Sequence, residues 1–149
     1  MQTTNTVLMI EPIAFGFNEQ TAVNNYFQIQ QEGNVQEKAL QEFHSFVEKL
    51  RAKGIDVITI KDTIEPKTPD SIFPNNWVSF HQDGKVVLYP MFADNRRLER
   101  REDIINQIKE QFDVKESIDY SKIENEDKYL EGAGSMIFDH DNKIAYGSV

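Results

Sequence analysis

The chain has 149 residues, of which 39% are hydrophobic and 28% are charged, and this is enough for one ordinary globular domain with its own core. Its formal net charge of −9 and isoelectric point near 4.8 argue against binding to nucleic acid or to an anionic membrane surface, because phosphates repel such a chain. The absence of cysteine excludes disulfides, thiolate metal sites and a cysteine nucleophile within these residues.

Targeting and metal-binding signals are also missing. No apolar run approaches the roughly 20 residues of a membrane span, and the first residues, MQTTNT, lack the basic and apolar regions of a signal peptide. We therefore expect a cytoplasmic protein. The histidines His44, His81 and His140 have no metal-ligand spacing to one another, so we interpret them as structural or solvated and expect no metal site.

The first half of the chain predicts a strand, a helix and a second strand. Residues 6–11 are an apolar run of strand length, and residues 55–60 alternate and are rich in branched side chains. Between them, apolar residues recur at helical spacing, with Asn34 as a candidate N-cap and Gly54 as a candidate stop. Residues 13–26 mix aromatic side chains with amides and predict a structured loop, which is a candidate lip of a pocket.

A proline-rich loop, PDSIFPNNW at residues 69–77, connects this βαβ-type unit to the next one. Pro69 and Pro74 fix φ and disfavour helix at the residues before them, so the loop is stiff. It holds a carboxylate, a ring and two amides close together: Asp70, Phe73, Asn75 and Asn76. This set suits a planar polar group such as a urea or a guanidine. The alternative is an ordinary turn, because Asp, Asn and Pro are common turn residues.

The second half predicts a hairpin, a helix and a strand. The hairpin is formed by residues 77–80 and 86–89 around the Asp-Gly signal in HQDGK. A helix of roughly 14 residues follows, and its apolar residues fall on one side: Leu98, Ile104, Ile105, Ile108 and Phe112. Residues 114–118 predict the strand.

The remaining segments begin a further repeat of this pattern. An acidic connection at residues 120–128 leads to a small-residue loop at 129–134 (YLEGAG) and to a second hairpin at 135–138 and 143–146. Hairpin, helix and strand together suggest a repeated ββαβ module, although no literal sequence repeat is present. Because a hairpin without a covering helix leaves an apolar face and an open edge, we expect residues 1–149 to be the N-terminal part of a single domain, truncated after the hairpin at 135–146.

Four blocks of the sequence, in the right order and over nearly the whole chain, carry a resemblance: FGFNEQTA, TPDSIFPNNW, PMFADNRRLERR and YLEGAGSM. They resemble the N-terminal half of the citrulline-hydrolase branch of the guanidino-group modifying (pentein) superfamily, whose relatives are dimethylarginine dimethylaminohydrolases, arginine deiminases and amidinotransferases. The resemblance implies an α/β fold, the pentein or β/α-propeller, built from five ββαβ modules. This chain would hold about two modules and a fraction of a third.

The resemblance also implies a reaction, the hydrolysis of citrulline to ornithine, ammonia and carbon dioxide. In such enzymes a cysteine attacks the ureido or guanidino carbon, a histidine acts as acid and base, and a carboxylate assists. The carboxylate matches Glu131, although Gly134 stands where relatives carry Asp. The relatives' histidine and cysteine fall outside this chain, so we expect it to be inactive alone. No metal or organic cofactor is implied.

The substrate-binding residues that the resemblance implies lie in two of the blocks. A D-x-x-F-x-x-D loop that holds cationic guanidines in relatives matches Asp70, Phe73 and Asn76, with Asn75 just before. A neutral ureido oxygen needs a donor, which an amide supplies and a carboxylate does not. The α-carboxylate of the substrate would bind Arg96 or Arg97, with Arg96 as first choice. We expect Arg100 and Arg101 to be solvated and paired with Glu99 or Glu102.

Two alternatives stay open. An arginine deiminase or a dimethylarginine hydrolase is disfavoured by Asn75 and Asn76, while the missing cysteine favours a non-catalytic amino-acid-binding module. In each case the expected partner is a small-molecule amino acid, without nucleic acid or membrane. A homo-oligomer or a separate C-terminal half would complete the fold.

Overall fold

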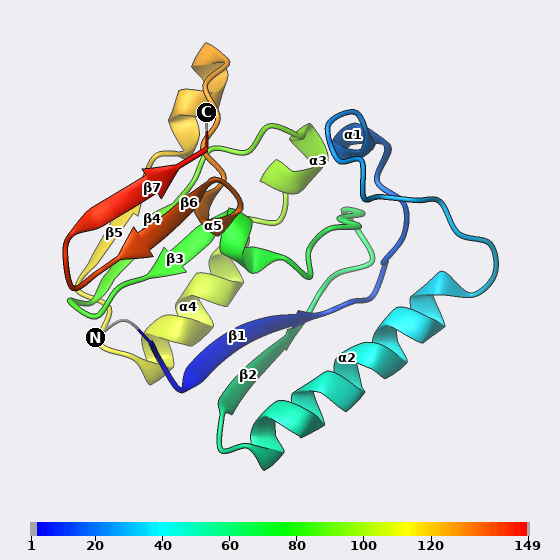
Figure 1. The fold of residues 1–149 in the computed structure, drawn as a ribbon, viewed down its shortest axis with the longest axis horizontal. Coiled ribbons are helices and arrows are strands. Elements are labelled where there is room, and N and C mark those ends of the chain that lie inside the picture. Colours follow the sequence, from blue (N-terminus) through cyan, green and yellow to red (C-terminus); the bar gives the residue numbers. More distant parts are fainter. Residues whose placement is uncertain (1–2, 149) are drawn as a thin grey trace. The chain divides into compact units, whose positions relative to one another are not determined.

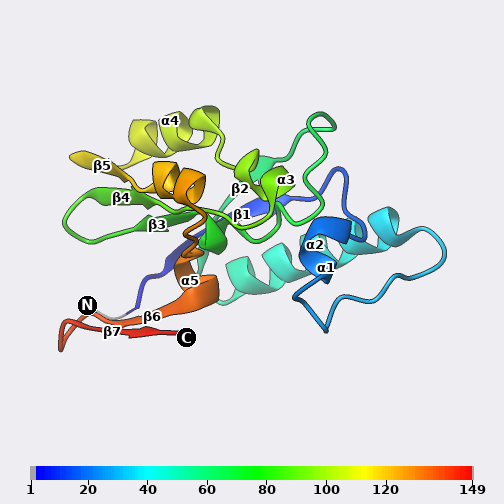
Figure 2. The same cartoon turned by 90° about the horizontal axis from the view of Figure 1, so that it is seen from above.

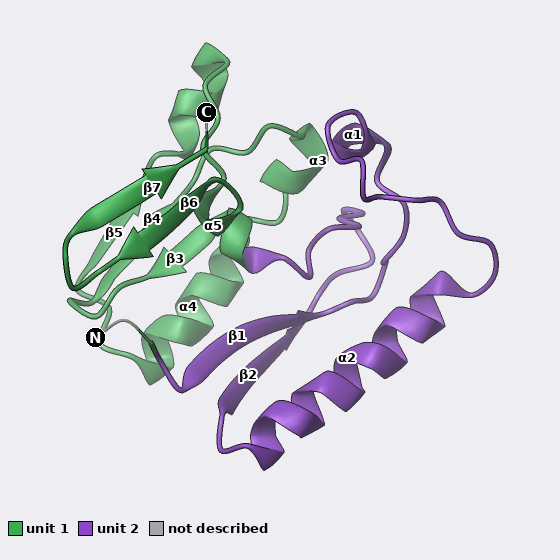
Figure 3. Cartoon of the chain, in the orientation of Figure 1, with its two compact units in different colours: residues 1–3, 75–149 green, residues 4–74 purple. Residues whose placement is uncertain are grey.

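The computed structural model describes residues 3–148, which form two compact units (Figure 3). Unit 2 comprises residues 4–74, and unit 1 comprises residues 75–148 together with Thr3. Figure 1 labels the elements of both units. Val149, the last residue of the sequence, lies outside the described residues.

Unit 2 is built around two parallel strands, as the sequence predicts. Strand β1 (Thr6–Glu11) pairs with β2 (Asp56–Lys61) in parallel, and the chain between them forms α1 (Glu19–Ala22) and α2 (Val35–Ala52). Parallel strands need a crossover of this length. The core of the unit consists of apolar side chains from β1, β2 and α2: Ile10, Val57, Ile60 and Val47.

The ends of α2 confirm the predicted capping signals. The side chain of Asn34 accepts a hydrogen bond from the backbone N–H of Glu37, and Gly54 adopts a φ of +81° just after the helix. The prediction of a loop over residues 13–26 was wrong at α1, because Asn18 caps that short helix by accepting from the N–H of Gln20.

Unit 1 contains a three-stranded sheet in the order β3–β4–β5. Strands β3 (Val78–Phe80) and β4 (Lys85–Leu88) are antiparallel, and β5 (Glu116–Asp119) is parallel to β4. The helices α3 (Asp94–Arg97) and α4 (Glu102–Gln111) lie between β4 and β5 in the chain, so this is a ββαβ arrangement. Its core includes residues from the sheet and from α4: Val78, Val86, Val87, Ile104, Ile105 and Ile108.

The predicted second hairpin is confirmed as β6 (Met136–Asp139) and β7 (Ile144–Gly147). In Figures 1 and 2, α4 lies on one side of the three-stranded sheet and the β6–β7 hairpin lies on the other. Three short helices complete the described chain: the 3₁₀ helices η1 (Pro74–Asn76) and η2 (Ser121–Glu126), and α5 (Gly132–Ser135). Both η2 and α5 fall in segments predicted as loops.

The predicted helix of roughly 14 residues is present as α4 with Ile104, Ile105 and Ile108 buried, but it is shorter than predicted. The prediction was wrong at residues 98–101, which lie between α3 and α4: Leu98 is exposed, and the backbone of Arg101 is extended. The apolar spacing takes no account of the charged side chains of this segment, which form ion pairs with one another and with Glu124 and Glu131. Strand β5 also begins two residues later than predicted.

Candidate functional site

The carboxylate of Glu131 is held by groups from several parts of unit 1. Its Oε2 accepts a hydrogen bond of 3.0 Å from Nδ2 of Asn76, and its Oε1 accepts one of 3.0 Å from the backbone N–H of Phe92. Nη1 of Arg96 lies 3.6 Å from Oε2. Both carboxylate oxygens therefore have a donor, and the orientation of the carboxylate is fixed.

Two glycines make this arrangement possible. Gly132 has a φ of +38°, and a Cβ at this position would overlap the backbone carbonyl oxygen of Asn75. A Cβ at Gly134 would overlap Nδ2 of Asn76. The amide of Asn76 thus occupies the space where a side chain at position 134 would begin, which gives a physical reason for glycine at this position.

The two neighbouring amides of η1 are placed differently. Asn76 is half-buried and bonded to Glu131, whereas the side chain of Asn75 is exposed and makes no hydrogen bond within the described residues. A carboxylate only accepts hydrogen bonds, so the NH₂ group of Asn76 must face Glu131. One N–H and the carbonyl oxygen of the Asn76 amide are left for other partners.

Arg96 is buried in an ion pair with Glu99. Its Nε and Nη2 atoms lie 3.0 Å from the two carboxylate oxygens, which is the bidentate geometry of a strong pair. The side chains are only 7% and 1% exposed. Arg96 is the residue that the sequence analysis favours for binding the substrate α-carboxylate, and its guanidinium is already engaged by carboxylates.

The other arginines of this segment pair elsewhere. Arg97 donates to the carbonyl oxygens of Met91 and Phe92 and pairs with the exposed carboxylate of Asp94. Arg100 was predicted to pair with Glu99 or Glu102, and this was wrong, because it pairs with Glu124. Arg101, predicted to pair with the same residues, pairs with Asp103. Arg100 is not solvated either, because its side chain is only 13% exposed.

Sequence reasoning missed Glu124 and did not assign Glu99 to Arg96. Glu124 accepts from the backbone N–H of Met91 at 3.1 Å and from Arg100 at 2.6 Å, just as Glu131 accepts from the next N–H along the chain. Glu99 could have been found from its position three residues after Arg96. Glu124 gives no local signal, because it is 24 residues away from Arg100.

In unit 2, Asp70 is buried and holds the loop that contains α1. Its Oδ2 accepts from Nδ2 of Asn18 and from the hydroxyl of Thr21, both at 2.8 Å. Gln28 accepts from the backbone N–H of Asn18 and donates to Thr21, which closes the network. This observed role for Asp70 is structural.

We expect Asn18→Ala to destabilise the protein by about 1–2 kcal/mol. The change removes both the cap of α1 and a donor to a buried carboxylate, and groups left unsatisfied in the interior are costly. Urea unfolding of the variant and of Gln20→Ala, an exposed neighbour on α1, would measure this. Equal midpoints for the two variants would contradict it.

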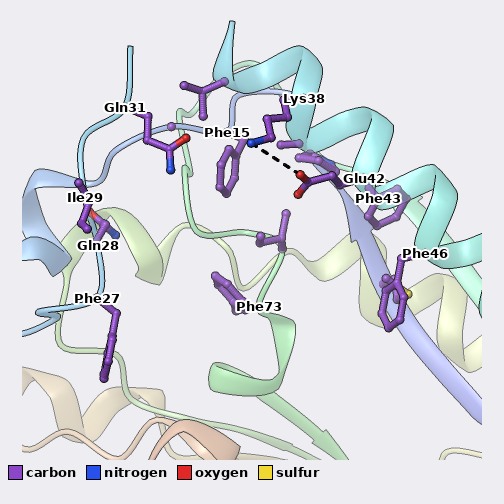
Figure 4. Close-up of a pocket in the computed structure, with 16 residues that line it drawn as sticks. Phe15, Phe27, Gln28, Ile29, Gln31, Lys38, Glu42, Phe43, Phe46 and Phe73 are labelled. Atoms are coloured by element: carbon purple, nitrogen blue, oxygen red, sulfur yellow. Dashed lines mark ion pairs between the residues drawn. The ribbon is translucent and has the colours of Figure 1, made fainter. Parts of the chain in front are cut away.

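Phe73 lines an open pocket of about 690 Å³ in unit 2. Figure 4 shows the ion pair of Lys38 and Glu42 at this pocket. The phenylalanines that line it are Phe15, Phe27, Phe43, Phe46 and Phe73 (Figure 4). Asp70 is not among its lining residues. The pocket includes part of the loop that we predicted as a lip, and its lining is mainly apolar.

Two of the histidines lie together in unit 1. The rings of His81, Phe138 and His140 are mutually 5.8–6.1 Å apart, and Nε2 of His81 is 2.8 Å from the hydroxyl of Ser79, which also contacts the hydroxyl of Tyr89. Within residues 3–148, no group of three or more His, Asp or Glu side chains is placed to hold a metal ion.

Burial, and then the charge of His140, lower the pKa of His81 below its ordinary value of 6.5, and the neighbouring Lys85 acts in the same direction, whereas Asp83 opposes them. A histidine with a lowered folded-state pKa favours folding above about pH 6.5, and this contribution is lost as the pH falls through the folded-state pKa. We expect the urea midpoint to fall more between pH 7.5 and pH 5 in the wild type than in His81→Gln. Equal losses would contradict this.

The sequence matches a known protein family. Residues 11–149 match the family model described as "N,N dimethylarginine dimethylhydrolase, eukaryotic". The chain belongs to this family. Membership in the dimethylarginine dimethylhydrolase family makes it a relative of hydrolases that act on guanidino groups, and it confirms the resemblance found in the sequence. No curated protein sequence gives a significant match.

Solved structures show the fold. The N-terminal domain of ArgZ bound to substrate, an arginine dihydrolase from the ornithine-ammonia cycle in cyanobacteria, matches with a TM-score of 0.67 and 19% identity over 95% of this chain and 48% of that chain. The ternary complex of AgrE with ornithine and NAD⁺ matches with a TM-score of 0.66 and 18% identity over 97% of this chain and 20% of that one. The chain therefore spans about half of the ArgZ domain, and the predicted α/β pentein fold is confirmed.

Within residues 3–148, no helix combines the length and the apolar character that a membrane span requires.

Proposed function

We propose that this chain carries the substrate-recognition residues and the acidic residue of a cysteine hydrolase that acts on the ureido carbon of citrulline. One citrulline and one water give one ornithine, one ammonia and one carbon dioxide. Membership in a guanidino-group hydrolase family supports the reaction class. The hydrogen bond between Asn76 and Glu131 is the observation that carries the choice of substrate.

The side-chain amide of Asn76 can offer a ligand both a donor and an acceptor. Its bond to Glu131 fixes the amide plane and leaves one N–H donor and one carbonyl acceptor. A ureido group presents a carbonyl oxygen and N–H groups, so it can meet both. A guanidinium presents donors only, and it would leave the remaining N–H of Asn76 without an acceptor.

For the other residues, the proposal keeps most of the sequence-based roles. Glu131 is the acidic catalytic residue, and Phe73 and Asn75 bind substrate. Asp70, the third sequence-based candidate for binding, supports the loop that contains α1 through Asn18 and Thr21. For the α-carboxylate, the geometry favours Arg97 over Arg96, because the guanidinium of Arg96 is engaged by Glu99. Small-molecule binding in the cytoplasm fits this role.

The nucleophile must come from outside these residues, because the chain has no cysteine. We propose that residues 1–149 are the N-terminal part of a pentein domain, which a C-terminal half completes; the coverage of only 48% of the ArgZ domain supports this. The purified 149-residue polypeptide should then release no ornithine from citrulline, whereas the full-length protein should. Turnover by the pure polypeptide would contradict the proposal.

A second candidate is hydrolysis of arginine or of a methylated arginine. The description of the family model and the arginine dihydrolase among the structural neighbours favour it. The two candidates separate in one assay, in which the full-length protein is given citrulline, arginine and dimethylarginine at equal concentrations. A higher kcat/KM for either guanidine than for citrulline would favour the second candidate.

A further inference from the structure

The two carboxylates beside Arg96 divide its donors between them. Nε and Nη2 bond to Glu99, and Nη1 lies 3.6 Å from Oε2 of Glu131. Glu99 is almost fully buried, so its charge depends on Arg96 for compensation. The guanidinium thus connects a buried carboxylate to the half-buried carboxylate of Glu131.

Displacing Glu99 from Arg96 would leave a buried charge without its partner. A ligand carboxylate that bound the Nε and Nη2 edge of Arg96 would have to do this, and the cost would exceed what one new ion pair returns. Arg97 is less constrained at one edge. Its Nη1 pairs with Asp94, which is 78% exposed, so that pair is weak and easily exchanged, whereas its Nε lies 3.7 Å from Glu124 and also donates to the carbonyl oxygen of Met91.

A backbone amide also helps to fix the position of the Glu131 carboxylate. Oε1 of Glu131 accepts from the N–H of Phe92, and Glu124 accepts in the same way from the N–H of Met91. These neighbouring amides report on two different carboxylates, of which only Glu131 pairs with Arg96. The amide of Met91 therefore serves as an internal control for changes at the amide of Phe92.

We propose that Arg96, supported by Glu99, is a positioning residue that holds the carboxylate of Glu131 in place, and that it does not bind the substrate. The inference rests on the proposed function for the catalytic role of Glu131. It does not depend on which amino acid is the substrate. Arg96 acts on the reaction only through Glu131.

Kinetics of Arg96→Lys in the full-length protein test this proposal. Lysine keeps the charge and loses the bidentate geometry. We expect kcat to fall on the order of 10- to 100-fold, because a small displacement of a catalytic group is costly, while KM stays within about threefold because no substrate contact is removed. Arg97→Lys should instead raise KM. Arg101→Lys, whose partner Asp103 is exposed, is the matched control and should change neither constant. An increase in KM at unchanged kcat for Arg96→Lys, or no change at all, would overturn the proposal.

Amide exchange provides a measurement that does not need activity. In Arg96→Lys, the amide of Phe92 should exchange with solvent about tenfold faster, while the amide of Met91 keeps its wild-type rate. Unchanged exchange at Phe92 overturns the positioning role even if the protein hydrolyses another substrate. Faster exchange without any turnover leaves the positioning role standing and counts against the proposed function alone. If Arg96→Lys does not fold, Glu99→Gln keeps the volume of the side chain and should give the same pattern with smaller changes.

Discussion

Gly132→Ala is expected to destabilise the protein by roughly 3 kcal/mol. The left-handed backbone at this position, with a φ of +38°, costs an alanine about 1–2 kcal/mol. The new Cβ would also overlap the carbonyl oxygen of Asn75, which is a backbone atom and cannot move without shifting η1. Overpacking of this kind adds about 1–3 kcal/mol. Urea unfolding of the purified variant measures the loss.

Gly134→Ala is the matched control for this experiment. Its Cβ would meet the end of the Asn76 side chain, which can rotate away, so the free energy of unfolding should change by less than about 1 kcal/mol. The amide of Asn76 should nevertheless leave Glu131. Equal destabilisation by the two substitutions would mean that backbone overlap at Gly132 is not the cause.

The βαβ unit and both hairpins could be predicted because their signals are local. The cap at Asn34, the turn glycine Gly84 and the alternation in β2 each act within a few residues, and the structure has these elements where they were expected. The start of α4 could not be predicted in the same way. The residues before it include Arg100, whose partner Glu124 lies 24 residues further on.

For the candidate site, the residues could be found from the sequence, but their contacts could not. The blocks that carry the family resemblance contain Asn76, Arg96 and Glu131, and the structure brings these three residues together in unit 1. Their roles could not be read from spacing, because Arg96 is defined by its burial against Glu99. Asp70 similarly holds Asn18 and Thr21, contacts that span about 50 residues of sequence.

Asn76→Asp in the full-length protein should move the ratio of kcat/KM values from citrulline toward arginine by about 10-fold to over 100-fold. The variant replaces the N–H that faces Glu131 with a carboxylate oxygen, so two carboxylates would then lie about 3.0 Å apart. A cationic guanidinium placed between them relieves this repulsion, while a neutral ureido group does not. The ureido oxygen also loses its donor, and an unpaired polar group costs about 1–3 kcal/mol.

Asn75→Asp provides the comparison, because it makes the same chemical change one residue earlier. The side chain of Asn75 is exposed and has no hydrogen bond within the described residues, so the added charge stays in solvent and is screened. Its shift in the citrulline-to-arginine ratio should be several-fold smaller than that of Asn76→Asp. A larger shift at position 75 would move substrate selection to the exposed amide. No shift at either position would remove the amides from the explanation, because the difference between a donor and an acceptor at this site is what the choice of citrulline requires.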